Sequence, residues 1–217
     1  MRTSYKTILN ASLAEYEEKK SRFLASVKPV SSEDEAQSFI EGLKTKYWDA
    51  THNVYAYFIG GDTVLQRFSD DGEPSGTAGL PVLEVIKRME LQDVAVVVTR
   101  YFGGTLLGAA GLVRAYGKSA ALGIESAEVV TKKLCTLVNV ILEYTLFGKV
   151  QSFIINNGYH IKGIVYGQDV EMLVYVPSGS LDDFNASIKD VTNDRALIDV
   201  QDNAYITLDN EDKLIND

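Results

Sequence analysis

Arginines and glycines gather in one segment of the sequence that could bind an anion. Arg100 ends an apolar run, Gly103 and Gly104 follow it, and Arg114 lies near the start of a predicted helix. The first N–H groups of a helix suit a phosphate or carboxylate, and arginine forms paired hydrogen bonds to either group. We therefore predict an anion-binding cradle here. The absence of a Gly-Lys-Ser/Thr phosphate loop and of a G-x-G-x-x-G pattern argues against an ATPase or a dinucleotide-binding protein.

A second segment, residues 69–79, carries carboxylates and hydroxyls between glycines, and this composition predicts a loop. We expect its carboxylates to orient Arg67, Arg100 or Arg114 by charge-assisted hydrogen bonds. The alternative is a small hydrolytic or phosphate-handling enzyme in which the loop works with His52 as acid or base. The candidate residues of the loop, in either role, are Asp70, Asp71, Glu73, Ser75 and Thr77.

A structural interpretation of both segments also stays open. The glycines would then serve a tight turn and close packing of helix on strand, while the arginines pair with the acids of the loop. The loop does not follow the ligand pattern of an EF-hand. We predict neither a metal site nor a cofactor.

The composition restricts the class of protein. Of the 217 residues, 46% are hydrophobic and 24% charged, as in soluble globular proteins. One cysteine excludes a disulfide framework, and two histidines argue against a histidine-rich metal site. The longest apolar runs fall far short of the ~20 residues of a membrane-spanning helix, and the polar start does not resemble a signal peptide. We expect a cytoplasmic protein without membrane contact.

The excess of acidic residues lies in the last third of the chain. Residues 1–135 contain 16 basic and 17 acidic side chains, whereas residues 136–217 contain 5 and 13. This change predicts a domain boundary near residues 132–137. The net charge of −9 does not steer the chain toward nucleic acid, so such binding needs a local basic patch in the first part.

The first part alternates strand and helix patterns. Ser32 and Glu35 form a capping box, which predicts a helix over residues 33–47. The valine-rich run in residues 93–101 is typical of a strand buried on both faces. The other patterns predict strands within residues 5–30 and at 54–59 and 63–68, and helices at 80–89 and from the glycine-rich segment to about residue 127.

The second part predicts a β-α-β-β-α-β order, which is that of a ferredoxin-like split βαβ domain. The predicted strands are 137–144, 159–166, 170–176 and 196–200, with a further strand at 204–208, and the predicted helices are 147–157 and 181–191. We expect the polar residues 209–217 to form a frayed tail.

Several motifs of the first part stand in an order and spacing that resembles one known family. The motifs are Lys20-Ser21-Arg22-Phe23, His52 with Ala56-Tyr57, the run from Arg67 to Pro81, the run from Val97 to Gly104, and Gly111-Leu112-Val113-Arg114-Ala115-Tyr116. Together they resemble the IMPACT/YigZ family, in its bacterial two-domain branch. The resemblance covers about residues 15–127, and the remainder resembles the small C-terminal domain of the bacterial members on weaker motifs.

The resemblance implies an α+β protein of two domains. Residues 1–132 would form an α/β sandwich like domain 2 of ribosomal protein S5. Residues 136–208 would form a ferredoxin-like βαββαβ domain, followed by the tail 209–217. Eukaryotic relatives act in translational control, so the resemblance also implies a role in translation.

We therefore hypothesise a non-enzymatic cytoplasmic module that binds RNA, the ribosome or translation factors and regulates translation. We expect the arginines to face phosphate and expect no specificity for a DNA sequence. The enzyme described above remains the alternative. The candidate anion- or nucleic-acid-binding residues are Arg22, Arg67, Arg100, Tyr101, Gly103, Gly104 and Arg114.

Overall fold

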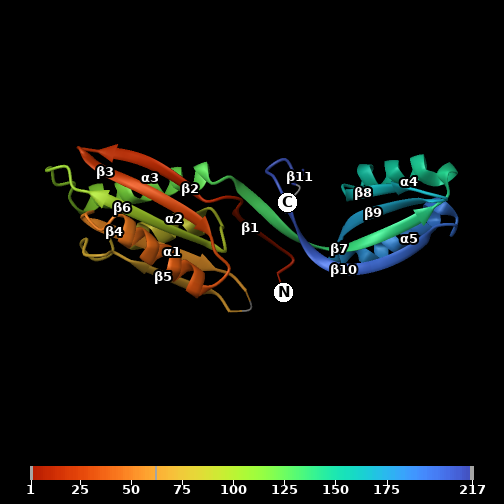
Figure 1. Ribbon diagram of the computed structural model, residues 1–217, viewed down its shortest axis with the longest axis horizontal. Coiled ribbons are helices and arrows are strands. Elements are labelled where there is room, and N and C mark those ends of the chain that lie inside the picture. Colours follow the sequence, from red (N-terminus) through yellow and green to blue (C-terminus); the bar gives the residue numbers. More distant parts are fainter. Residues whose placement is uncertain (1, 62, 216–217) are drawn as a thin grey trace. The chain divides into compact units, whose positions relative to one another are not determined.

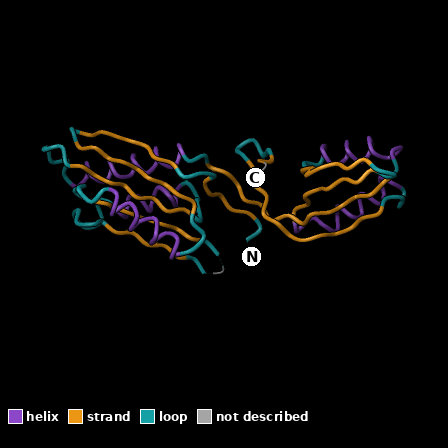
Figure 2. Tube along the Cα trace, in the orientation of Figure 1, coloured by secondary structure: helices purple, strands orange, loops and turns teal. Residues whose placement is uncertain are grey.

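The computed structural model of the chain describes residues 2–61 and 63–215. Within these residues the chain forms two antiparallel sheets and five α-helices, which confirms a mixed α+β class. The chain divides into two compact units: unit 1 is Tyr5–Thr131, and unit 2 is residues 132–215 together with Arg2–Ser4. Figure 1 labels the elements, and Figure 2 distinguishes helices, strands and loops in the same view. No helix in the described residues is long and apolar enough to cross a membrane.

A five-stranded sheet forms the centre of unit 1. Its strand order is β2-β3-β6-β4-β5, and all neighbouring strands are antiparallel. Helix α1 packs on one face, and helices α2 and α3 pack on the other (Figure 1). The elements are β2 (Ser12–Glu18), β3 (Ser21–Pro29), α1 (Glu33–Lys46), β4 (His52–Ile59), β5 (Leu65–Ser69), α2 (Gly79–Arg88), β6 (Val94–Tyr101) and α3 (Ala109–Ser126).

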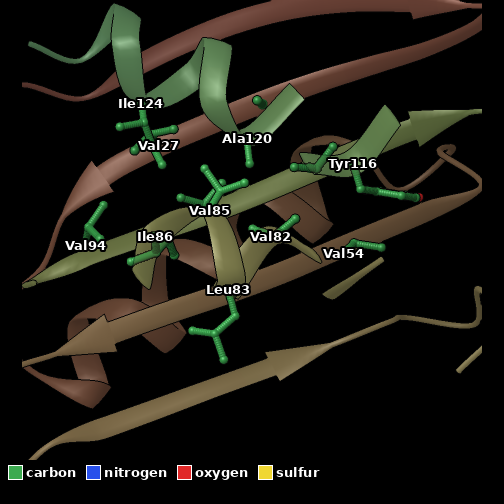
Figure 3. Close-up of a cluster of buried hydrophobic side chains, with 14 of the residues drawn as sticks. Val27, Val54, Val82, Leu83, Val85, Ile86, Val94, Tyr116, Ala120 and Ile124 are labelled. Carbon is green, nitrogen blue, oxygen red and sulfur yellow. The ribbon is translucent and has the colours of Figure 1, made fainter. Parts of the chain in front are cut away.

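The middle strand β6 is buried on both faces, as its valine-rich run predicted. Val94, Val96 and Val98 pack with α2 and α3, whereas Ala95 and Val97 pack with α1. This division follows from the period of two residues along a strand. Figure 3 shows the core on the α2 and α3 side, with labelled residues that include Val82, Val85, Ile86, Tyr116, Ala120 and Ile124.

Unit 2 contains a sheet in the order β11-β10-β7-β9-β8. Helices α4 and α5 pack on this sheet over a core that includes Val138, Val174 and Phe184. The elements are β7 (Val129–Leu142), α4 (Tyr144–Asn156), β8 (His160–Tyr166), β9 (Val170–Pro177), a 3-10 turn (Ser178–Ser180), α5 (Leu181–Thr192), β10 (Leu197–Leu208) and β11 (Leu214–Ile215). A further strand, β1 (Ser4–Ile8), pairs with β7.

The domain boundary expected near residues 132–137 does not coincide with a loop, because strand β7 runs through these residues without interruption. The charged Lys132 sits within this strand and donates a hydrogen bond from Nζ to Thr207 Oγ1 at 2.6 Å. The two units divide between Thr131 and Lys132, so the division lies inside a strand and next to the expected boundary. Tyr144, expected to end the strand, begins α4 instead.

The end of the chain also differs from the sequence prediction. The segments 196–200 and 204–208 belong to one strand, β10. In the tail, Leu214 and Ile215 pair with Leu208 and Thr207 as β11, so this part is not frayed. Residues 216–217 lie outside the described residues.

Two glycines of α3 test how closely this helix packs on the sheet. A Cβ at Gly123 would lie 2.9 Å from the Cβ of Ala25 and 2.8 Å from Cγ2 of Val27, whereas a Cβ at Gly117 would come no nearer than 3.8 Å to Val85. We expect Gly123→Ala to lower the free energy of unfolding by about 1–3 kcal/mol through overpacking. We expect Gly117→Ala to raise it by about 0.5–1 kcal/mol, because alanine favours a helix. Urea denaturation measures both, and equal changes would contradict this packing.

Candidate functional site

Arg100 lies in the interior of unit 1. Its neighbours across the sheet are Phe23 on β3 and His52 on β4, so the three side chains share one face. Arg100 continues the alternation of Val96 and Val98 and faces the layer of α2 and α3. Only 5% of the residue is exposed. Contrary to the sequence-based expectation, its guanidinium group is therefore not available to an external phosphate.

The counterion of Arg100 is Glu73, from the loop that precedes α2. Glu73 Oε1 lies 2.6 Å from Arg100 Nη1 and accepts a hydrogen bond from the Tyr116 hydroxyl at 2.7 Å. Arg100 Nη2 donates to Ser21 Oγ at 3.3 Å, and Nε has no partner among the described residues. Burial, together with the Glu73 carboxylate, raises the pKa of Tyr116 far above its usual range, so the hydroxyl stays protonated as a donor. We call these four residues the buried ion-pair cluster.

His52 borders this cluster and is fixed by the loop backbone. Its Nδ1 lies 2.8 Å from the carbonyl oxygen of Asp71. Because a carbonyl only accepts, Nδ1 carries the proton of this bond. Its Nε2 lies 3.8 Å from Glu73 Oε1, which is longer than a hydrogen bond. The ring is therefore oriented against the loop, at the edge of the Glu73 carboxylate.

The two aspartates of the loop bind backbone N–H groups. Asp70 accepts three such bonds at 2.8–3.0 Å, from Gly76, Ala78 and Gly79. These bonds cap helix α2, whose own N-cap residue forms no side-chain bond. The Asp71 carboxylate accepts from the N–H of Asn53 at 2.6 Å. Of the carboxylate–arginine pairs expected from the sequence, the described residues of this loop form Glu73–Arg100 alone.

The hydroxyl residues of the loop do not form a nucleophile–base pair with His52 among the described residues. The Thr77 hydroxyl is buried and donates to the carbonyl oxygen of Pro74 at 2.6 Å. Ser75 is exposed and forms no hydrogen bond within the part of the chain that the structure describes. A hydrolase of the serine type needs such a pair within hydrogen-bond reach. No cluster of three or more His, Cys, Asp or Glu side chains suited to a metal ion occurs in the described ranges.

Gly103 holds the segment after β6 against the turn between β2 and β3. Its N–H donates to Ser21 Oγ at 3.2 Å, and a Cβ here would lie 2.0 Å from the carbonyl carbon of Lys20. Any other side chain would force the two segments apart. Gly104 follows with a φ of +82°, in the left-handed region that favours glycine. The Gly103-Gly104 turn therefore packs against the chain close to the buried ion-pair cluster.

The remaining candidate residues do not gather around one phosphate. Two of the exposed arginines and Tyr101 already have acidic partners. The pairs are Arg22 with Glu15, Arg67 with Glu33, and Tyr101 with Asp49. Arg22 lies opposite Tyr101 on β6, whereas Arg67 is level with Ala95. At about 3.3 Å per residue, these positions are about 20 Å apart along the strand. The four arginines are therefore dispersed.

Arg114 is the candidate arginine that stays on the surface without an acidic partner in the described residues. It lines a hollow of about 280 Å³ beside the start of α3, together with Lys19 and Lys118. Lys118 lies over the ring of Tyr16, 4.5 Å from its centroid. We call this the basic hollow. Sequence analysis missed both lysines, although Lys118 follows Arg114 by one helical turn and so shares its face.

Comparison with known proteins gives two family-model matches. The model described as the Impact N-terminal domain matches residues 19–124, and a domain of unknown function, DUF1949, matches residues 140–195. The first match contains every candidate site residue predicted from the sequence. It includes the buried ion-pair cluster and the basic hollow except for Tyr16 and Glu18.

Relatives match along most of the chain. The IMPACT family member YvyE of Bacillus subtilis is 42% identical over 94% of this chain and 94% of its own length. The IMPACT family member YigZ of Escherichia coli is 32% identical over 79% of this chain and 85% of its own length. A crystal structure of a hypothetical protein is similar with a TM-score of 0.59 and 28% identity, covering 91% of this chain and 97% of that one.

The buried ion-pair cluster predicts a large cost for the loss of Glu73. We expect Glu73→Gln to lower the free energy of unfolding by about 3–5 kcal/mol, because it leaves a buried guanidinium without its counterion. Tyr116→Phe removes one hydrogen bond to the same carboxylate and should cost about 1 kcal/mol. Urea denaturation compares the two variants. A Glu73→Gln variant as stable as Tyr116→Phe would contradict the role of Glu73 as counterion.

Proposed function

Because the chain belongs to the IMPACT family, we propose that it acts in translational regulation, as a non-enzymatic module that binds RNA or the translation machinery. The family motifs lie in unit 1, where they build the buried ion-pair cluster and the start of α3. Translational control is the role that the resemblance to IMPACT proteins implies. Family membership supports the same role for this chain.

The observation that carries the proposal is the basic hollow. Lys19, Arg114 and Lys118 line it, and none of them forms an ion pair with an acidic residue in the described residues. The hollow is also lined by Glu18, whose carboxylate accepts a hydrogen bond from the Tyr16 hydroxyl at 2.6 Å. Three cations against one carboxylate leave this concave surface positive, which suits the phosphates of an RNA backbone. This surface takes the place of the group of four arginines as the proposed RNA contact, and Arg114 is common to both.

The buried ion-pair cluster has a positioning role in this proposal. Glu73 ties Arg100 of β6 to Tyr116 of α3, and Tyr116 lies two residues after Arg114. The cluster therefore fixes the first turns of α3, which carry the basic hollow. Glu73 is already engaged by Arg100 and Tyr116, and no serine or threonine hydroxyl of the described residues is hydrogen-bonded to His52, which supports binding over hydrolysis.

We further infer the fold family of each unit and the domain organisation. The sheet of unit 2 has the order β10-β7-β9-β8 with α4 and α5 packed on it, which supports a ferredoxin-like domain at residues 136–208. The sheet and helix layers of unit 1 support an S5 domain 2-like sandwich at residues 1–132. A cytoplasmic location without membrane partners and without DNA sequence specificity completes the proposal.

The domain assignment predicts that the two cores lose stability independently. Phe184 is fully buried in the core of unit 2, so we expect Phe184→Ala to cost that unit about 3–5 kcal/mol. Hydrogen exchange followed by mass spectrometry should then show faster exchange in residues 140–208 and unchanged exchange in residues 9–126. Faster exchange throughout both ranges would contradict two domains.

The basic hollow predicts salt-dependent binding of RNA. We expect a fluorescent 20-nucleotide RNA of mixed sequence to bind the chain, and Lys19→Ala/Arg114→Ala to weaken this binding at least about tenfold at low salt. The magnitude of the slope of log K against log salt should fall by about 1.4, because each of the two lost phosphate contacts removes roughly 0.7 for a single strand. Fluorescence anisotropy over a salt series measures both quantities.

The matched control is Arg22→Ala/Arg67→Ala, which removes two exposed cations that have acidic partners. This variant should bind RNA nearly as the parent does. If both double variants bind equally well, or if the parent binds neither RNA nor purified ribosomes, the proposed function is wrong. Urea denaturation of both variants verifies that the fold is retained.

A further inference from the structure

A second hollow lies between helices α2 and α3. It has a volume of about 490 Å³ and is open to solvent. Two of its apolar side chains, Leu80 and Val113, are 39% and 41% exposed, which is high for aliphatic residues of a packed helix pair. We call this surface the α2/α3 groove. Its apolar lining residues are Leu80, Pro81, Val85, Val113, Gly117 and Ala121.

Positive charges edge the groove on both helices. Arg88 of α2 and Arg114 and Lys118 of α3 are exposed and line it. None of the three forms an ion pair with an acidic residue within residues 2–61 and 63–215. The acidic lining residue, Glu84, lies 3.6 Å from Lys87 and is thereby neutralised. An apolar floor is thus combined with three cations that have no counterion.

This combination fits a protein segment better than RNA or a small molecule. Single-stranded RNA binds largely by stacking its bases on aromatic side chains, and none of the described lining residues is aromatic. A small ligand usually has 70–90% of its surface buried, which an open groove does not provide. An aliphatic side chain would cover the apolar floor, and flanking carboxylates would neutralise the cations.

We propose that the α2/α3 groove binds a short acidic segment of a partner protein, which inserts an aliphatic side chain between flanking Asp or Glu residues. This goes beyond RNA binding in the basic hollow, because Arg88, Leu80 and Gly117 do not line that hollow. Arg114 and Lys118 line both surfaces. Variants of residues that line one surface alone, such as Lys19 in the basic hollow and Gly117 in the groove, therefore distinguish the two sites.

Gly117 controls the space in the groove. A Cβ at Gly117 would lie 3.8 Å from Val85 Cγ2, an ordinary van der Waals contact, so a longer side chain would extend into the hollow. Gly117→Leu should therefore fill the groove and keep α3 intact, because leucine favours a helix. Arg88→Glu reverses one charge at the edge. Its matched control is Lys46→Glu, because Lys46 is likewise exposed in the last turn of a helix, here α1, forms no ion pair in the described residues and does not line the groove.

The test selects peptides from a display library of random 16-residue sequences on the full chain. We expect the enriched peptides to share an aliphatic residue with acidic residues around it. Gly117→Leu and Arg88→Glu should each weaken the binding of an enriched peptide at least about tenfold in fluorescence anisotropy. Lys46→Glu should change it by no more than about twofold. Urea denaturation establishes that each variant is folded.

The proposal is overturned if the library yields no enriched acidic peptide, or if the enriched peptides bind Gly117→Leu as they bind the parent. It is also overturned if Lys46→Glu weakens binding as much as Arg88→Glu does. The same RNA probe is measured in parallel. If Gly117→Leu weakens RNA binding as strongly as Lys19→Ala/Arg114→Ala, the groove is part of the RNA surface and the proposal fails. If peptides bind the groove but RNA and ribosomes do not bind, the proposed function fails and this inference stands.

Discussion

The burial of the Arg100 guanidinium against Glu73 is the constraint on which the arrangement of the acidic loop, helix α3 and strands β3 and β6 depends. A charge in the interior is tolerated only with a counterion and hydrogen-bond partners. Glu73 therefore has to be held in place by its loop, which Asp70 secures through three backbone N–H groups. Tyr116 and Ser21 complete the cluster from α3 and from the start of β3. One ion pair thus links a loop, a helix and two strands.

Glycine makes this convergence sterically possible. At Gly103 the neighbouring turn occupies the place of a side chain, and at Gly123 the β3 side chains do so. Helix α3 consequently lies close on the sheet and turns Arg114 and Lys118 outward. Gly79 allows the same approach of α2 to the carbonyl of Ser69. The glycine-rich motifs therefore allow close packing. By fixing the position of α3, they also fix where Arg114 and Lys118 reach the surface.

Local patterns in the sequence predicted most helices and strands. The residues whose surroundings were predicted wrongly are those whose partners lie far away in the sequence. The capping box placed α1 correctly, because the Ser32 side chain accepts from Glu35 three residues away. Arg100 could not be placed in this way, since its counterion lies 27 residues earlier in a loop. The change of charge near Lys132 predicted a domain boundary, but the hydrogen bond of this lysine to Thr207, 75 residues away on β10, could not be predicted from a local pattern. Lys19 adds to the basic hollow from a turn nearly one hundred residues before Arg114.

A chain with a net charge of −9 can still present a positive surface, because electrostatic fields are local in salt solution. At physiological ionic strength, exposed charges more than about 8 Å apart are largely screened from each other. Residues 1–135, with 16 basic and 17 acidic side chains, are nearly neutral as a whole. Within them Arg22, Arg67 and Arg100 are each neutralised by a glutamate. Arg88, Arg114 and Lys118 form no ion pair within the described residues and line the two hollows along α2 and α3, so the pattern of ion pairs in unit 1 leaves positive charge at this surface.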